Sequence, residues 1–141
     1  MSLTRALVPL LTLPILAACG PDETISGFLD PSETWQLAEL DGAPWAAEAT
    51  LSFPEAGRVT GRGPCNAFNA TQSAPYPWIE IGPIAATRRA CPELAAEARF
   101  FEALGAMAIA EVSGDVLLLS GEDAREMVFL AAGRAAGGSA P

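Results

Sequence analysis

The chain has 141 residues and a formal charge of −9, with 17 acidic residues against eight arginines, and it contains neither lysine nor histidine. An acidic chain without a basic cluster does not follow a nucleic-acid backbone, and one without imidazole or amine side chains lacks His-based triads, His metal ligands, Schiff-base lysines and the P-loop lysine. We therefore expect one domain that binds no nucleic acid, metal or cofactor and is not an enzyme.

The first 18 residues are predicted to be a signal peptide. Arg5 is the only charged residue before Asp22, and an apolar run extends from Ala6 to Ala18. This run is shorter than the about 20 residues that cross a bilayer, and it ends in small residues, as a secretory signal does. The sequence Leu-Ala-Ala-Cys at positions 16–19 resembles the bacterial lipobox, in which the chain is cleaved before a cysteine that is lipidated. An ordinary signal peptide followed by an incidental cysteine is the alternative.

Lipidation of Cys19 would anchor the chain to a membrane of the cell envelope. The lipobox resemblance implies a diacylglycerol on the thiol and a further acyl chain on the amine, and two or more chains hold a protein stably. The next residue is Gly20, not the Asp that commonly retains lipoproteins at the inner membrane, so we expect the outer membrane, with the protein facing the periplasm. Residues 19–33 are rich in Gly, Pro and acidic residues without a period, which predicts a flexible tether.

Residues 34–130 are predicted to form the folded domain, whose first half consists of short strands. Trp35 and Leu37 alternate with polar residues, as in a half-buried strand, and Asp41-Gly42 is a turn signal. Two further segments, residues 50–53 and 58–62, predict a hairpin. A glycine-rich corner at residues 61–66, a loop at residues 71–77 and a strand at residues 78–81 follow.

The second half is predicted to hold one helix and a strand meander. Proline suits the first helical position, so the helix is expected to start at Pro92, with Glu97 directed away from its apolar face. That face is formed by Leu94, Ala98, Phe101, Leu104 and Ala108. Three short strands should follow, and residues 131–141 are predicted to be disordered. The result is an α+β fold, in which a curled antiparallel sheet or partly closed barrel packs against the helix.

Cys65 and Cys91 remain as a pair once Cys19 is lipidated. An even number of cysteines in an exported chain predicts a disulfide, which would contribute about 3 kcal/mol by restricting the unfolded chain. Two buried reduced thiols are the alternative. A metal site is disfavoured because two thiolates without His do not complete a zinc site, and a redox site because no Cys-x-x-Cys is present.

Several motifs occur in a recognisable order along the folded region. They are Trp35-x-Leu37, Leu51-x-Phe53, Gly57-Arg58-Val59-x-Gly61, Cys65-Asn66-x-Phe68, Thr87-x-x-Ala90-Cys91-Pro92, Glu97-x-x-Phe100 and Gly114-Asp115-x-Leu117-x-Leu119. This series resembles the META domain family, which includes the HslJ-like heat-shock lipoproteins. The resemblance implies a compact β-rich domain with one helix, paired Cys65 and Cys91, and an envelope protein without known catalysis. Pro64 departs from the family, which usually has Gly before the first cysteine, and Arg89 stands where a less polar residue is common.

From these observations we expect a non-enzymatic envelope protein, monomeric by default, that binds or stabilises an unidentified envelope protein under stress. Asn66 is expected to lock its turn, since Asn side chains bond to nearby backbone. A small inhibitor of a secreted or periplasmic protease is one alternative function. A carboxylate-based hydrolase is another, although no spacing singles out two acids. The residues expected at a partner surface are Arg62, Pro64, Asn66, Tyr76 and Trp78.

Overall fold

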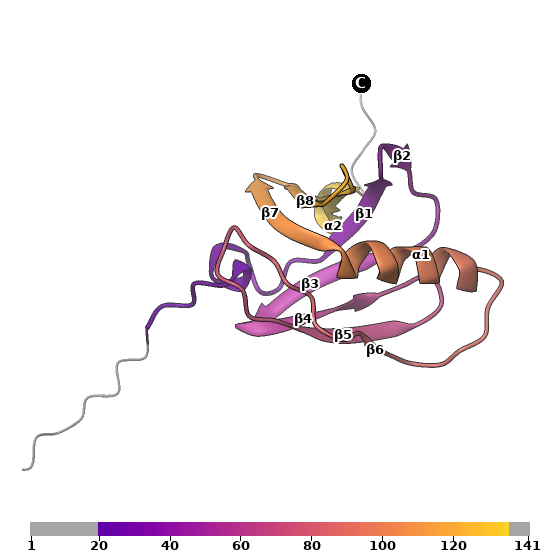
Figure 1. Cartoon of the computed structure of the whole chain (residues 1–141), viewed down its shortest axis with the longest axis horizontal. Helices are drawn as coiled ribbons and strands as arrows, with labels where there is room; N and C mark the ends of the chain where they lie inside the picture. Colours follow the sequence, from indigo (N-terminus) through magenta and orange to yellow (C-terminus); the bar gives the residue numbers. More distant parts are fainter. Residues whose placement is uncertain (1–19, 136–141) are drawn as a thin grey trace, which may run out of the picture.

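The structure is a computed structural model that describes residues 20–135, so the predicted signal peptide, Cys19 and residues 136–141 lie outside it. Within this range one nine-stranded antiparallel sheet has the strand order β6-β5-β4-β3-β1-β9-β8-β7, with β2 paired to β1. The sheet curls into a half-barrel, and helix α1 lies across one of its openings (Figure 1). The predicted α+β class is therefore confirmed.

The first hairpin follows from its turn residues. Strands β1 (Trp35–Leu40) and β2 (Ala43–Pro44) pair on either side of Asp41 and Gly42. Both turn residues have positive φ, 50° and 76°, which is the geometry of the turn that Asp-Gly favours in two-residue hairpins. The predicted turn is confirmed.

The hairpin predicted from residues 50–53 and 58–62 is present, but the strand after it was not predicted. Strands β3 (Thr50–Glu55) and β4 (Gly57–Arg62) pair antiparallel, and β5 (Ala67–Gln72) pairs along the whole of β4. The predicted loop at residues 71–77 therefore starts too early. Strand β5 is hard to predict because Ala70 and Gln72, a small and a polar residue, are two of its three buried positions. The short strand β6 (Ala85–Ala86) pairs with β5 at the outer edge.

Residues 77–81 connect the two outer edges of the half-barrel. They do not form the predicted strand, and Trp78 and Ile81 make only isolated bridges, to Ile109 and Gln72. The carbonyl of Pro77 accepts the N–H of Ala110 at 2.7 Å, and Ile79 donates to the carbonyl of Ala108 at 3.0 Å. The buried Gln72 side chain accepts from the N–H of Glu80 at 2.8 Å, so this closing segment is bonded to both edges.

Helix α1 (Leu94–Gly105) starts after Pro92 and buries a different face from the predicted one. Its buried residues are Glu97, Phe100, Ala103 and Leu104, whereas Leu94, Ala98 and Ala108 are exposed. The Phe100 ring meets the Phe68 ring of β5 edge-on, with centroids 5.7 Å apart. Of the predicted face, Leu104 is buried and Phe101 packs against the core, but the helix turns Glu97 and Phe100, and not Leu94 and Ala98, toward the sheet.

The C-terminal meander is as predicted, and the domain extends beyond both predicted boundaries. Strands β7 (Met107–Ser113), β8 (Val116–Gly121) and β9 (Glu126–Ala131) pair in order, and β9 also pairs with β1. Residues 132–135 form the short helix α2 (Ala132–Ala135), so the predicted disordered tail was wrong in this part. The predicted tether contains the 3-10 turn η1 (Ile25–Phe28), in which Ile25 is fully buried in the core. No helix in residues 20–135 is long and apolar enough to cross a membrane.

Candidate functional site

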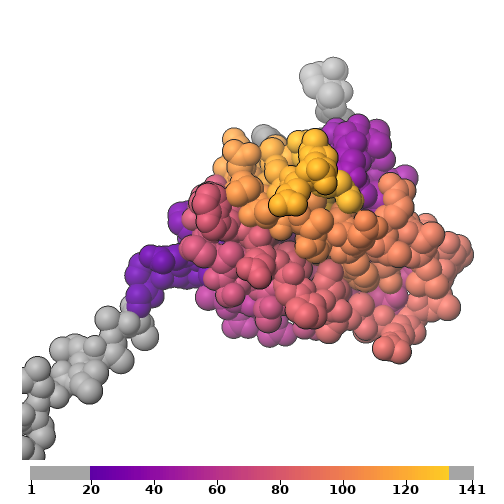
Figure 2. Space-filling model, viewed as in Figure 1, coloured from indigo at the N-terminus to yellow at the C-terminus, as the bar shows by residue number. Residues whose placement is uncertain are grey.

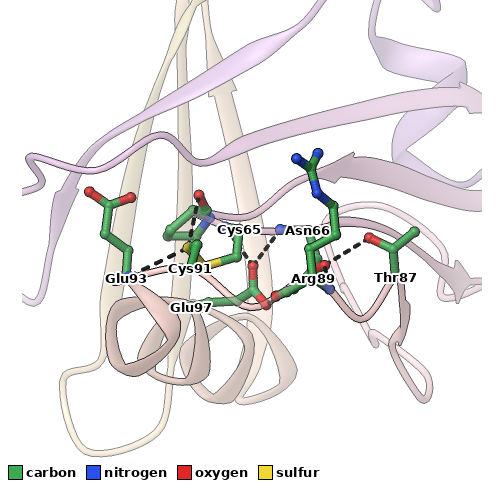
Figure 3. The surroundings of a disulfide bond; sticks show 8 residues. Cys65, Asn66, Thr87, Arg89, Cys91, Glu93 and Glu97 are labelled. Carbon is green, nitrogen blue, oxygen red and sulfur yellow. Dashed lines mark hydrogen bonds between the residues drawn. A yellow bond between two sulfur atoms is a disulfide. The ribbon is translucent and has the colours of Figure 1, made fainter.

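A disulfide between Cys65 and Cys91 connects the corner after β4 to the loop before α1 (Figure 3). Their Cα atoms lie 5.8 Å apart, within the usual range for a disulfide. The pairing expected from the sequence is therefore present, and the alternative of two reduced thiols is not. The loop that carries Cys91 also carries Arg88 and Arg89, so the bond fixes this loop against the sheet.

The carboxylate of Glu97 holds the same corner from the helix side. Its Oε2 accepts the backbone N–H groups of Cys65 at 2.8 Å and Asn66 at 2.7 Å, and its Oε1 accepts the side-chain amide of Asn66 at 2.7 Å. The residue is 5 % exposed. The prediction that Glu97 points away from the core was thus wrong. Three donors satisfy the buried charge, which makes this burial tolerable.

Asn66 links the corner to the loop between β6 and α1. Its Oδ1 accepts the N–H of Arg89 at 2.6 Å and the hydroxyl of Thr87 at 2.9 Å, while its amide also donates to the carbonyl of Arg89 at 3.3 Å. Asn66 is only 4 % exposed. Its hydrogen bonds therefore hold the turn, as expected, and little of its surface is open to the partner for which it was also a candidate.

The glycine-rich corner has glycines because neighbouring atoms come too close for a side chain. A Cβ at Gly61 would lie 2.0 Å from the carbonyl oxygen of Thr50, and one at Gly63 would lie 2.9 Å from Glu97 Oε2. The N–H of Gly63 donates to the carbonyl of Asn66 at 2.7 Å, which closes the corner around the half-buried Pro64. These glycines thus permit the close contacts around the corner.

The exposed side of this region carries unpaired positive charge. Arg62 is exposed and forms an ion pair with Glu48 at 3.6 Å. Arg88 and Arg89 are exposed and form no ion pair within the described residues. The Arg89 side chain points away from the Glu97 network (Figure 3). Both arginines border a shallow hollow of about 370 Å³ together with Leu94, which is 47 % exposed. We call Arg88, Arg89 and Leu94 the corner surface.

The other two residues expected at a partner surface lie elsewhere. Tyr76 and Trp78 follow the end of β5, whereas Arg62 and Pro64 precede its start, and a strand of this length spans roughly 20 Å. Tyr76 stacks on Phe28 with ring centroids 4.5 Å apart, and Trp78 is 55 % exposed. The five predicted residues therefore do not form one surface.

The remaining tryptophans are part of the packing. Trp35 is 3 % exposed in the core, and the half-buried Trp45 borders a groove of about 310 Å³. The guanidinium of Arg99 lies 5.8 Å from the centroid of the Trp45 ring, within cation–π range. No group of three or more His, Cys, Asp or Glu residues in the described part of the chain could hold a metal ion.

Sequence reasoning gave no site role to Glu97, Arg88, Arg89 or Leu94. A usable signal for Glu97 was present, because it stands three and seven residues before Phe100 and Leu104 and so shares their face of the helix. Nothing in the local sequence distinguishes Arg88 from a solvated arginine. Cys19 lies outside the described residues, so its predicted lipidation remains a prediction.

Comparisons with known proteins agree with this architecture. The sequence model of one protein family, described as META domain, matches residues 29–134. No curated protein matches the chain. The NMR structure of a protein from Burkholderia xenovorans is similar with a TM-score of 0.61 at 20 % identity, covering 87 % of this chain and 99 % of that chain. The crystal structure of a DUF4847 family protein from Bacteroides vulgatus has a TM-score of 0.58 at 17 % identity, covering 74 % and 94 %. At such identities the likeness shows the fold alone.

Proposed function

Because the chain belongs to the META domain family, we propose that it is a lipid-anchored protein of the cell envelope that binds and stabilises a partner protein there and catalyses no reaction. The observation that carries this proposal is the corner surface. It displays two arginines without acidic partners on a loop that a disulfide and a buried hydrogen-bond network hold in place. The resemblance to HslJ-like lipoproteins supports a role under envelope stress. The Leu-Ala-Ala-Cys sequence followed by Gly20 supports anchoring at the outer membrane, facing the periplasm.

A binding role agrees with what the buried carboxylate does. A general acid or base must exchange a proton with its substrate. Glu97 is the one buried acidic residue of the described chain, and both of its oxygens accept hydrogen bonds from Cys65 and Asn66. The Glu97 carboxylate thus accepts hydrogen bonds that hold the corner in place. This supports a binding module over the hydrolase alternative.

The chemistry of the corner surface favours an acidic partner. The guanidinium groups of Arg88 and Arg89 can each bind a carboxylate through two parallel hydrogen bonds. The exposed Leu94 offers an apolar contact beside them. Within residues 20–135 these two arginines form no ion pair, so their guanidinium groups are available to another molecule. The proposed partner therefore presents carboxylates around an apolar side chain.

Protease inhibition receives less support from the same geometry. An inhibitor must present a protruding segment that can enter a cleft. Arg62 ends β4, which is paired on both sides, and the following corner is bonded to Glu97. The proline-rich loop around Pro75 and Pro77, the other segment that could be presented to a protease, is also held by the domain. Pro75 forms a bridge with Thr24, and the carbonyl of Pro77 accepts the N–H of Ala110.

The anchor is tested by two substitutions at adjacent positions. Cys19→Ala removes the thiol that would carry the lipid, so we expect the protein to leave the membrane fraction of lysed cells. Gly20→Asp should keep the lipid and shift the protein to the inner membrane on a density gradient. Palmitate labelling should persist in Gly20→Asp and vanish in Cys19→Ala. Full membrane recovery of Cys19→Ala would contradict the proposed anchor.

The binding role is tested by crosslinking the anchored protein in intact cells. We expect the double variant Arg88→Ala/Arg89→Ala to lose its crosslinked partner, because a hydrogen bond to a charged group contributes about 1.5–3 kcal/mol, so that affinity should fall at least about tenfold. The matched control is Arg58→Ala/Arg62→Ala, which removes two exposed arginines that pair with the chain's own Glu55 and Glu48. Equal recovery of the partner with both double variants would contradict the assignment of the corner surface.

A further inference from the structure

Three aromatic residues lie on two segments, residues 23–28 and 75–78, that meet where the N-terminal segment joins the domain. Phe28 is 57 % exposed and Trp78 is 55 % exposed, the two highest values among the large apolar residues of the described chain. The ring of Tyr76 stacks on Phe28 at a centroid distance of 4.5 Å and an interplanar angle of 28°. We call Phe28, Tyr76 and Trp78 the aromatic rim.

The rim is held firmly, although it lies in turns and loops. Tyr76 donates its N–H to the carbonyl of Glu23 at 2.7 Å, and its hydroxyl accepts the N–H of Val112 at 3.4 Å. Trp78 bridges Ile109 of β7. Exposed apolar rings held in a fixed position indicate a contact with another molecule or a membrane, because burying these rings there would be favourable.

The buried Ile25 brings the rim close to the predicted lipid. Since Ile25 is fixed in the core, only residues 20–24 lie between it and Cys19. Six extended steps from Cys19 to Ile25 reach roughly 20 Å. The segment is shorter than that, because Asp22 accepts the N–H of Thr24 at 2.9 Å and also the hydroxyl of Ser26. A lipid on Cys19 would therefore keep Ile25, which begins the turn that carries Phe28, within about 20 Å of the bilayer surface.

The arrangement of the domain suits a membrane at its N-terminal side. Residues 20–28 emerge at one side of the domain, and the loop that leads into α1 lies at the opposite side (Figures 1 and 2). A membrane at the N-terminal side leaves the corner surface facing away from it. The corner surface would then be open to a partner in the periplasm.

The chemistry of the rim also suits a bilayer interface. Tryptophan and tyrosine concentrate at the level of lipid headgroups, where an apolar ring and a polar tip are both accommodated. Asp22 and Glu23 flank the rim, and hydrogen bonds from the hydroxyls of Ser26 and Thr24 lower the pKa of the Asp22 carboxyl, which therefore stays charged. Negative charge at this position favours a zwitterionic over an anionic lipid surface.

We propose that the aromatic rim inserts into the headgroup region of the bilayer to which Cys19 is anchored, and so orients the domain with the corner surface away from the membrane. This inference rests on the proposed lipid anchor. The alternative is that another protein covers the rim. The short N-terminal segment favours the membrane, because it limits the distance between the rim and the bilayer.

The test uses the acylated mature protein in phosphatidylcholine vesicles whose acyl chains carry bromine, a contact quencher of tryptophan fluorescence. Trp35 and Trp45 remain in Trp78→Phe, so the difference between the parent and this variant isolates the emission of Trp78. We expect the brominated lipid to quench most of this component. Insertion into the less polar bilayer should also shift the Trp78 emission to the blue. Phe28→Ser should weaken the quenching, whereas the control Leu94→Ser, at a 47 % exposed position on the helix side of the domain, should not.

Vesicle flotation separates the failure of this inference from that of the anchor. Protein that floats with the vesicles while Trp78 remains unquenched would overturn the orientation proposed here, leave the anchor intact and point to a protein as the occupant of the rim. Protein that does not float would overturn both the anchor and the inference. Equal quenching in Phe28→Ser and in the parent would also overturn the rim as the contact.

Discussion

Replacing Glu97 by alanine is expected to lower the free energy of unfolding by about 3–5 kcal/mol, since each unsatisfied buried donor costs about 1–3 kcal/mol. The carboxylate accepts three hydrogen bonds from Cys65 and Asn66 at 2.7–2.8 Å in a site that is 5 % exposed. Its removal leaves the N–H groups of Cys65 and Asn66 and the Asn66 amide without their acceptor. Urea unfolding followed by tryptophan fluorescence measures the loss.

Two further variants make this result specific. Glu102→Ala changes a carboxylate of the same helix that is exposed and contacts Arg125 at 3.6 Å, so it should cost no more than about 0.5 kcal/mol. Glu97→Gln keeps the shape but turns one acceptor into a donor that faces another donor, and we expect a loss of about 1–3 kcal/mol. A Glu97→Ala protein as stable as Glu102→Ala would show that the network contributes little.

Removing the disulfide by Cys65→Ala/Cys91→Ala is expected to destabilise the domain by about 3 kcal/mol, mainly by enlarging the conformational freedom of the unfolded chain. The two cysteines are 26 positions apart. The double variant should still fold, because Glu97 and Asn66 hold the same two segments together without the bond. The midpoint of urea unfolding should therefore fall while the native circular dichroism spectrum is retained.

The parent treated with reductant provides the control for this prediction. Reduction leaves both side chains in place, so its unfolding midpoint should fall to nearly that of the double alanine variant. An unchanged midpoint in reductant would mean that the bond does not contribute to stability. Combining the cysteine substitutions with Glu97→Ala should lower the stability further than either change alone, because the corner then loses both its covalent bond to Cys91 and its hydrogen bonds to the helix.

Local patterns in the sequence were sufficient for the elements whose buried residues are large and apolar. The alternation of Trp35 and Leu37 predicts β1, and the hairpin and the C-terminal meander follow from similar alternation between Gly-containing turns. The Asp41-Gly42 turn follows from residue type, since both residues need positive φ. The motif order also predicted the family and the cysteine pairing.

The sequence could not reveal where polar or small residues are buried. Glu97 looks like a surface residue until three donors from a segment 31 and 32 positions away surround it. Strand β5 was missed because Ala70 and Gln72 fill two of its buried positions, and Ile25 was missed because a single apolar residue gives no period. In each case burial depends on partners distant in the chain.

The sequence by itself thus determined the fold class, the hairpins, the helix and the cysteine pair, because these depend on residue type and short-range spacing. The tertiary structure alone decided that Glu97 and Asn66 form a buried network, that Arg88 and Arg89 have no acidic partner within residues 20–135, and that Tyr76 stacks on Phe28. The physical reason is that a hydrogen bond, an ion pair or a ring contact needs two groups brought together by the whole fold.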